Sequence, residues 1–174
     1  MATLKNNETF QIDLIEVGNV LTQYKVELEA LLKRKLMDKG NVASGDLLAS
    51  IHTRLEVNGD TFEVWLDCLK YLKFLDEGTK AHWPPDEPII RWIKEKRLPT
   101  REYTGDKSLP TEKQLSFLIR RKISQEGTLP NFVYVETLQE LNEKYIPLVE
   151  QALTNDVINY FATIGIHYTI SLKM

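Results

Sequence analysis

An Asn-Gly pair between two alternating segments is the feature that most constrains this chain. Apolar and polar side chains alternate on both sides of Asn58 and Gly59. Asn-Gly is typical of the two-residue type I′ turn that joins antiparallel strands. With this pair as the loop, the pattern predicts a hairpin in which Leu55 faces Phe62, Thr53 faces Val64, Ile51 faces Leu66 and Arg54 meets Glu63.

Apolar residues at three- and four-residue spacing predict two long helices. The first extends from Leu14 to Met37 and is ended by Gly40. The second begins near Asn131 and continues toward Phe161, with a kink predicted at Pro147. Each helix carries one apolar stripe, so both can bury that stripe against a sheet.

Shorter elements are predicted between the hairpin and the last helix. Asp86 is expected to cap a helix that ends near Arg97. Thr111 and Gln114 form the signature of a capping box, and Gly127 closes the helix that follows. That helix is expected to bury Leu115, Leu118 and Ile119, and residues 98–110 are predicted to be an exposed loop.

Alternation returns at residues 166–172 and predicts a C-terminal strand added to the hairpin's sheet. The fold class that follows is α+β, with a small antiparallel sheet packed by two long helices and shorter ones. The 174 residues are expected to form a single domain, 1–174, in which 156–174 is a C-terminal extension. We predict no membrane partner, because no apolar run reaches the roughly 18 residues that a spanning helix needs.

Charge is distributed unevenly along the chain. The net charge is −3, which argues against a protein whose main task is to grip nucleic acid. Residues 80–125 hold eleven Lys or Arg against six Asp or Glu, a local +5, and the remainder of the chain carries −8. This asymmetry suits head-to-tail self-association. The residues predicted to form a subunit interface are Trp83, Arg91, Arg97, Arg101, Arg120 and Arg121.

Alternative interpretations stay open for two parts of that surface. Trp83 could be an exposed interface anchor or an ordinary core aromatic. The basic clusters around Arg91 and Arg120 could be a solvated face, a subunit contact or a nucleic-acid contact, and both lie toward helix C-termini, where cations are favoured in any case.

The sequence predicts no catalytic, cofactor-binding or metal-binding residues. The three histidines are scattered and Cys68 is the only cysteine, whereas a metal site needs closely spaced ligands. The sequence contains no G-x-S-x-G elbow and no glycine-rich phosphate loop. We therefore expect a protein that is not an enzyme, and a catalytic site dispersed beyond motif recognition is the remoter alternative.

Three short motifs stand out within residues 12–155. The first enters the hairpin as Ala43-Ser-Gly-Asp-Leu-Leu-Ala-Ser50, and the second follows it as Tyr71-Leu-Lys-Phe-Leu-Asp-Glu-Gly-Thr79. These two resemble the tail-completion, or head–tail joining, family of tailed phages. The third, residues 119–132, is similar to the virion-morphogenesis relatives, in which a basic helix ends at Gly-Thr. The matching residues are Gly45, Leu47, Ser50, Tyr71, Glu77, Gly78, Thr79, Gly127, Thr128 and Phe132.

The resemblance implies a non-enzymatic virion protein. It would form a homo-oligomeric ring of six or twelve subunits at the neck or tail top, and join portal-side proteins to the tail around a channel through which DNA passes. Its location would be the virion, and the host cytoplasm during assembly. The alternative from another class is a nucleic-acid-binding adaptor that uses the basic patch within residues 91–122.

Overall fold

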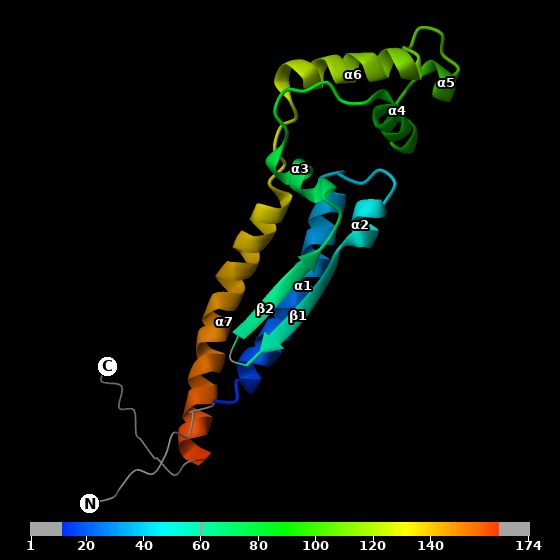
Figure 1. Ribbon diagram of the computed structural model, residues 1–174. Helices are drawn as coiled ribbons and strands as arrows, with labels where there is room; N and C mark the ends of the chain where they lie inside the picture. The colour runs from blue at the N-terminus through cyan, green and yellow to red at the C-terminus, as the bar shows by residue number, and fades with distance from the viewer. Residues whose placement is uncertain (1–11, 60, 164–174) are drawn as a thin grey trace, which may run out of the picture.

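The computed structural model describes residues 12–59 and 61–163, and these form seven helices and one two-stranded antiparallel sheet (Figure 1). The α+β class is therefore confirmed. The predicted C-terminal strand, 166–172, lies outside the described residues. The elements are α1 (Ile15–Asp38), α2 (Asp46–Ser50), β1 (His52–Asn58), β2 (Thr61–Asp67), α3 (Tyr71–Glu77), α4 (Asp86–Glu95), α5 (Arg101–Thr104), α6 (Glu112–Glu126) and α7 (Val133–Thr163).

We call α1, α2, the hairpin, α3 and α7 the body. The two long helices lie side by side and the hairpin lies against α1 (Figure 1). Their shared core has two parts along the length of the body. The first contains Leu32, Leu36, Leu47, Ile51, Leu72 and Val133, and the second contains Leu28, Leu31, Leu141 and Tyr145.

Polar contacts also hold α7 to the beginning of α1. The carboxylate of Asp156, which is buried, accepts hydrogen bonds of 3.0 Å from the backbone N–H groups of Glu16 and Val17. These N–H groups belong to the first turn of α1 and have no partner within the helix. Asp156 therefore caps α1 although it lies almost 140 residues further along the chain.

The hairpin register differs from the prediction by two residues. Leu55 pairs with Val64 and Val57 with Phe62, so Asn58 is a paired residue and Gly59 is the first residue of the loop. The observed register matches Val57 with an apolar partner, whereas the predicted one leaves it beside the loop. Because side chains alternate with period two, the two-residue shift keeps every predicted face. It does place Arg54 opposite Trp65 instead of Glu63.

We call residues 80–126, which contain α4, α5 and α6, the head. It lies across one end of the body, opposite the end where α1 begins and α7 ends (Figure 1). Helices α4 and α6 pack together and bury Ile93 and Ser116. The Lys96 ammonium donates to the Gly40 carbonyl oxygen, which gives the head one polar contact with the turn after α1.

The prediction of an exposed loop at 98–110 is wrong in part. The segment contains α5, and Thr100, only 1% exposed, caps that helix by accepting from the Tyr103 N–H. The Arg101 guanidinium donates to the Lys107 carbonyl oxygen at 3.0 Å, and the Arg101 N–H donates to the Pro110 carbonyl oxygen. Backbone hydrogen bonds order this segment. Such bonds leave no apolar periodicity in the sequence, so the pattern of side chains does not predict the order.

Helix boundaries and faces give further outcomes. The capping box of Thr111 and Gln114 is confirmed. The prediction that Asp86 caps α4 is wrong, because Pro85 is the cap residue and Asp86 begins the helix. Leu118 is 53% exposed instead of buried. Among the described residues the extensive packing partner of α6 is α4, so a narrow face suffices for its packing.

Candidate subunit interface

The two Gly-Thr motifs meet where the head joins the body. Thr79 and Thr128 form an antiparallel bridge in which each N–H donates to the other residue's carbonyl oxygen at 3.1 Å. Their hydroxyls lie 3.0 Å apart and form a further hydrogen bond. The chain therefore enters the head at Thr79 and leaves it at Thr128 through one closed pair, which we call the clasp (Gly78, Thr79, Gly127 and Thr128).

Both clasp glycines are required by their surroundings. A Cβ atom on Gly78 would lie 2.3 Å from the Thr128 carbonyl oxygen, and one on Gly127 would lie 1.9 Å from the Thr79 carbonyl oxygen. Their backbones have φ of 73° and 75° with ψ of −173° and −157°, a region that essentially only glycine occupies. The close approach of the two strands thus explains both glycines.

Asp76 ties the clasp to the beginning of α7. This carboxylate is 5% exposed, and one of its oxygens accepts from the Tyr134 N–H at 2.6 Å. The backbone carbonyl oxygen of Asp76 accepts hydrogen bonds from the N–H groups of Asn131 and Phe132. Phe132 has φ of 54°, which is rare for an aromatic residue, and its side chain is 51% exposed. This role of Asp76 could not be predicted from the sequence, because its partners are more than fifty residues away.

The remaining motif residues have local structural roles. Gly45 has φ of 89° and precedes α2, and Leu47 belongs to the core. The Ser50 hydroxyl donates to the Leu47 carbonyl oxygen at 2.8 Å and accepts from the Leu69 N–H at 3.1 Å, so it closes the open end of the hairpin. Tyr71 is 51% exposed, and Glu77 lies at the surface 3.9 Å from the Lys73 ammonium.

A polar cluster in the head surrounds Arg120. Its Nε donates to the Pro84 carbonyl oxygen at 2.8 Å, and its Nη1 lies 3.2 Å from the Asp86 carboxylate. The same carboxylate accepts from the Ser116 hydroxyl. The guanidinium also lies over the Trp83 ring at 5.0 Å, and that ring contacts Phe117 edge-on at 6.0 Å. Trp83 is half exposed and held from two sides, as interface aromatics often are.

These contacts divide the predicted interface residues into two groups. Arg91, Arg97 and Arg121 are exposed, and no hydrogen bond or ion pair joins their side chains to another residue within 12–59 and 61–163. Arg120 and Arg101 instead serve intramolecular contacts. Arg120 is therefore less accessible to another subunit than Arg121, because its side chain is only 18% exposed and already paired with Asp86, and its place in an interface stays a prediction.

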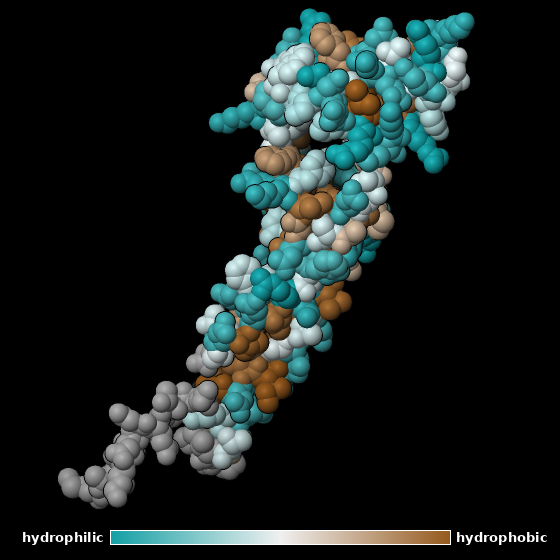
Figure 2. Space-filling model, turned by 45° about the vertical axis from the view of Figure 1, so that its right-hand side comes forward, coloured by the Kyte–Doolittle hydropathy of each residue, from teal (hydrophilic) through white to brown (hydrophobic). Residues whose placement is uncertain are grey.

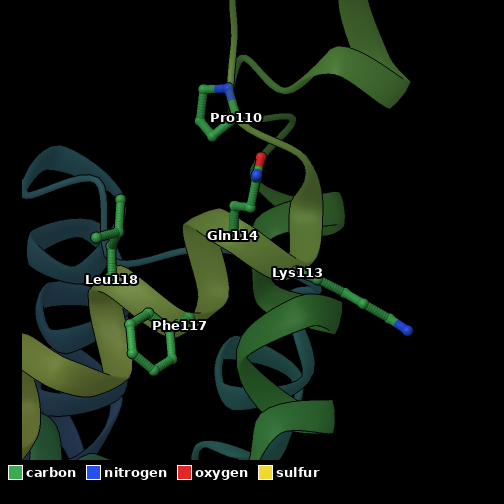
Figure 3. A pocket seen from close by; sticks show the side chains of 5 residues that line it. All are labelled: Pro110, Lys113, Gln114, Phe117 and Leu118. Carbon is green, nitrogen blue, oxygen red and sulfur yellow. The ribbon is translucent and has the colours of Figure 1, made fainter.

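The outer face of α6 carries a shallow apolar hollow of about 490 Å³. Five residues line it, and Lys113 is the single ionisable one among them (Figure 3). Phe117 and Leu118 are 51% and 53% exposed, and the Lys113 side chain extends away from the helix. The other two lining residues are Pro110 and Gln114.

A stripe of opposite charge lies on α7. Ile146 and Leu153 are 55% and 45% exposed, and Glu143 and Glu150 lie beside them at spacings of three and four residues. Neither carboxylate pairs with a side chain of the described residues, unlike Glu140, which pairs with Lys35 of α1, and Glu136, which pairs with Lys39 at the end of that helix. Figure 2 shows such exposed hydrophobic side chains on both the body and the head.

Ionisation equilibria are perturbed chiefly at one contact between α1 and α7. Burial and a 2.6 Å hydrogen bond to Glu27 raise the pKa of Tyr145 to about 12. Hydrogen bonds from Lys144 and Tyr145 lower the pKa of the Glu27 carboxyl. Both shifts favour a neutral phenol beside a carboxylate at this contact between the two helices.

Within residues 12–59 and 61–163 no three His, Cys, Asp or Glu side chains come together as a metal site requires. No helix in the same part of the chain is long and apolar enough to cross a membrane. Comparison with protein-family models, curated proteins and solved structures finds no match for this chain.

Proposed function

We propose that this protein is a non-enzymatic structural subunit of a tailed-phage virion. It assembles into a ring of six or twelve copies at the neck or tail top, and connects portal-side proteins to the tail. DNA passes through the ring without being bound specifically, and the subunits assemble in the host cytoplasm.

The observation that carries this proposal is the clasp. Two short motifs, chosen from the sequence for their likeness to tail-completion proteins, pair through their backbones although 49 residues separate Thr79 from Thr128. Here each motif supplies the glycine that lets the other approach, so the two function as one structural unit.

The surface supports an assembling protein in two ways. Large apolar side chains are exposed on α1, α3, the hairpin, α6 and α7, and an extended monomer gains by covering them. The net charge of −3 suits a channel, because a wall that repels phosphate lets DNA slide.

Light scattering across protein concentration and salt, followed by electron microscopy of the largest species, tests this function. We expect an oligomer with a central opening whose mass is unchanged by added duplex DNA. A chain that stays monomeric at every concentration, also in the presence of portal-side protein, would refute the proposal.

The adaptor remains a second candidate because Arg91, Arg97 and Arg121 are exposed and unpaired within the described residues. It predicts that a monomer binds duplex DNA with an affinity that falls steeply as salt rises. Binding that is weak at low salt and unaffected by R91A, R97A and R121A would exclude it.

A further inference from the structure

The outer faces of α6 and α7 are complementary in charge and both apolar. On α6 the face consists of Lys113, Phe117, Leu118 and Arg121, and on α7 it consists of Glu143, Ile146, Glu150 and Leu153. All eight side chains are exposed. None of the four charged side chains forms an ion pair within residues 12–59 and 61–163.

The two faces also match in length. Lys113 and Arg121 are eight residues apart, which corresponds to about 12 Å along a helix, and Glu143 and Glu150 are seven apart, about 10.5 Å. Two ion pairs can therefore form together across one helix crossing, with the apolar side chains between them. Exposed ion pairs alone contribute little, so the apolar contact supplies affinity and the charges supply register.

One chain cannot satisfy its own faces. The first turn of α6 lies near α5, at the far side of the head from the beginning of α7 (Figure 1). Glu143 is ten residues into α7, so it lies about 15 Å along the body from the beginning of that helix. A second copy of the chain is the occupant that carries the complementary face by necessity.

We propose that the α6 face of one copy docks on the α7 face of the next. The contact joins two different surfaces, so a docked pair still offers one free α6 face and one free α7 face, and repetition closes a ring when the rotation permits. This inference rests on the proposed function, because it specifies how the ring subunits touch.

Charge reversal tests the pairing. K113E/R121E and E143K/E150K each set like charges against one another, and each is expected to weaken self-association more than about tenfold. The quadruple variant restores opposite charges at every contact and is expected to recover the wild-type mass by light scattering. A one-to-one mixture of the two double variants is expected to recover it as well. K80E/K107E, which makes the same charge change on exposed side chains of the head outside the α6 face and outside the predicted interface residues, is the control and is expected to assemble normally.

Cross-linking gives a second readout that does not depend on affinity. In a C68S background, L118C/I146C is expected to form inter-chain disulfides on mild oxidation and to give a ladder of species. V26C/L118C uses a 61% exposed position on α1 and is expected to stay monomeric on a denaturing gel.

The outcomes separate this inference from the function on which it rests. A wild-type oligomer that the double variants leave intact overturns the α6–α7 contact and leaves the ring standing. Dissociation by both double variants without recovery in the quadruple variant also overturns the contact. A wild-type chain that never associates, even with portal-side protein, overturns both.

Discussion

In the body, five of the six side chains that are less than 2% exposed are apolar, whereas in the head two of three are hydroxyl-bearing. Leu32, Leu36 and Ile51 are fully buried in the body. The head buries Thr100 and Ser116 beside Ile93, and hydrogen bonds to Asp86 and the α5 backbone satisfy them. The body is stabilised mainly by the hydrophobic effect and the head by a small polar network.

This difference teaches that the two regions respond differently to change. An apolar core of many contacts tolerates the loss of one hydrogen bond, whereas a polar network loses several when one member is removed. The head also presents large apolar side chains to solvent, on α6 and at Trp83. A weakly cored head with an exposed apolar face is suited to gain stability on docking.

The largest effect is expected from truncation in the body. L32A removes a fully buried side chain and leaves a cavity, so we expect the free energy of unfolding to fall by about 2–5 kcal/mol. Urea denaturation measures it. V26A, at a 61% exposed position of the same helix, is expected to change stability by less than about 0.5 kcal/mol. Equal effects of the two substitutions would contradict the assignment of the core.

The clasp is expected to come next. G127A places a Cβ 1.9 Å from the Thr79 carbonyl oxygen in a backbone region reserved for glycine, so we expect a loss of about 2–4 kcal/mol. G105A is the matched control, because its φ of 77° is similar but its Cβ would meet nothing within 4 Å. It is expected to cost about 1 kcal/mol. Hydrogen exchange would show faster exchange throughout the head in G127A and near α5 alone in G105A.

A smaller effect, confined to the head, is expected from Arg120. R120A removes contacts with Pro84, Asp86 and Trp83, and we expect a local loss of about 1–2 kcal/mol. Hydrogen exchange of α4 and α6 measures this loss, while α1 and α7 exchange as in the wild type. R121A, at the exposed neighbouring position, is expected to leave both regions unchanged. Faster exchange in the body of R120A would mean that the two regions are not independent.

The smallest effect concerns pH and belongs to the body. The pKa of Tyr145 is about 12 when folded, against 10.0 ordinarily, so the unfolded chain loses this proton first. This contribution to stability is complete below pH 10 and is lost as pH rises toward 12. Y145F, which retains the ring that packs against Tyr24, is expected to show a shallower fall in stability between pH 9 and 11. An identical slope in the two proteins would refute the role of this phenol.

Much of the secondary structure could be predicted from the sequence because its causes are local. The helix over 14–37 appears as α1, and the capping box begins α6 where Thr111 and Gln114 predict it. The hairpin and its faces follow from alternation around one turn. These features depend on contacts within a few residues, which a linear pattern contains.

The candidate site was predictable only in its parts. Gly78, Thr79, Gly127 and Thr128 could be singled out as motif residues, but nothing in the sequence says that they pair. Arg120 and Arg121 look equivalent in the sequence. The position of Asp86 across the α4–α6 contact distinguishes them, because it pairs with the largely covered Arg120 and leaves Arg121 exposed. Burial depends on what lies opposite a side chain, and the sequence does not state that.

The sequence by itself determined the α+β class, the long helices, the hairpin faces and the uneven charge. Tertiary structure decided the hairpin register, the exposure of Leu118, the capping of α1 by Asp156 and the joining of the two Gly-Thr motifs. The physical reason is the range of the interactions. Periodicity and capping depend on residues within one or two helical turns of each other. The features that tertiary structure decided arise from contacts between residues that only the folded backbone brings together.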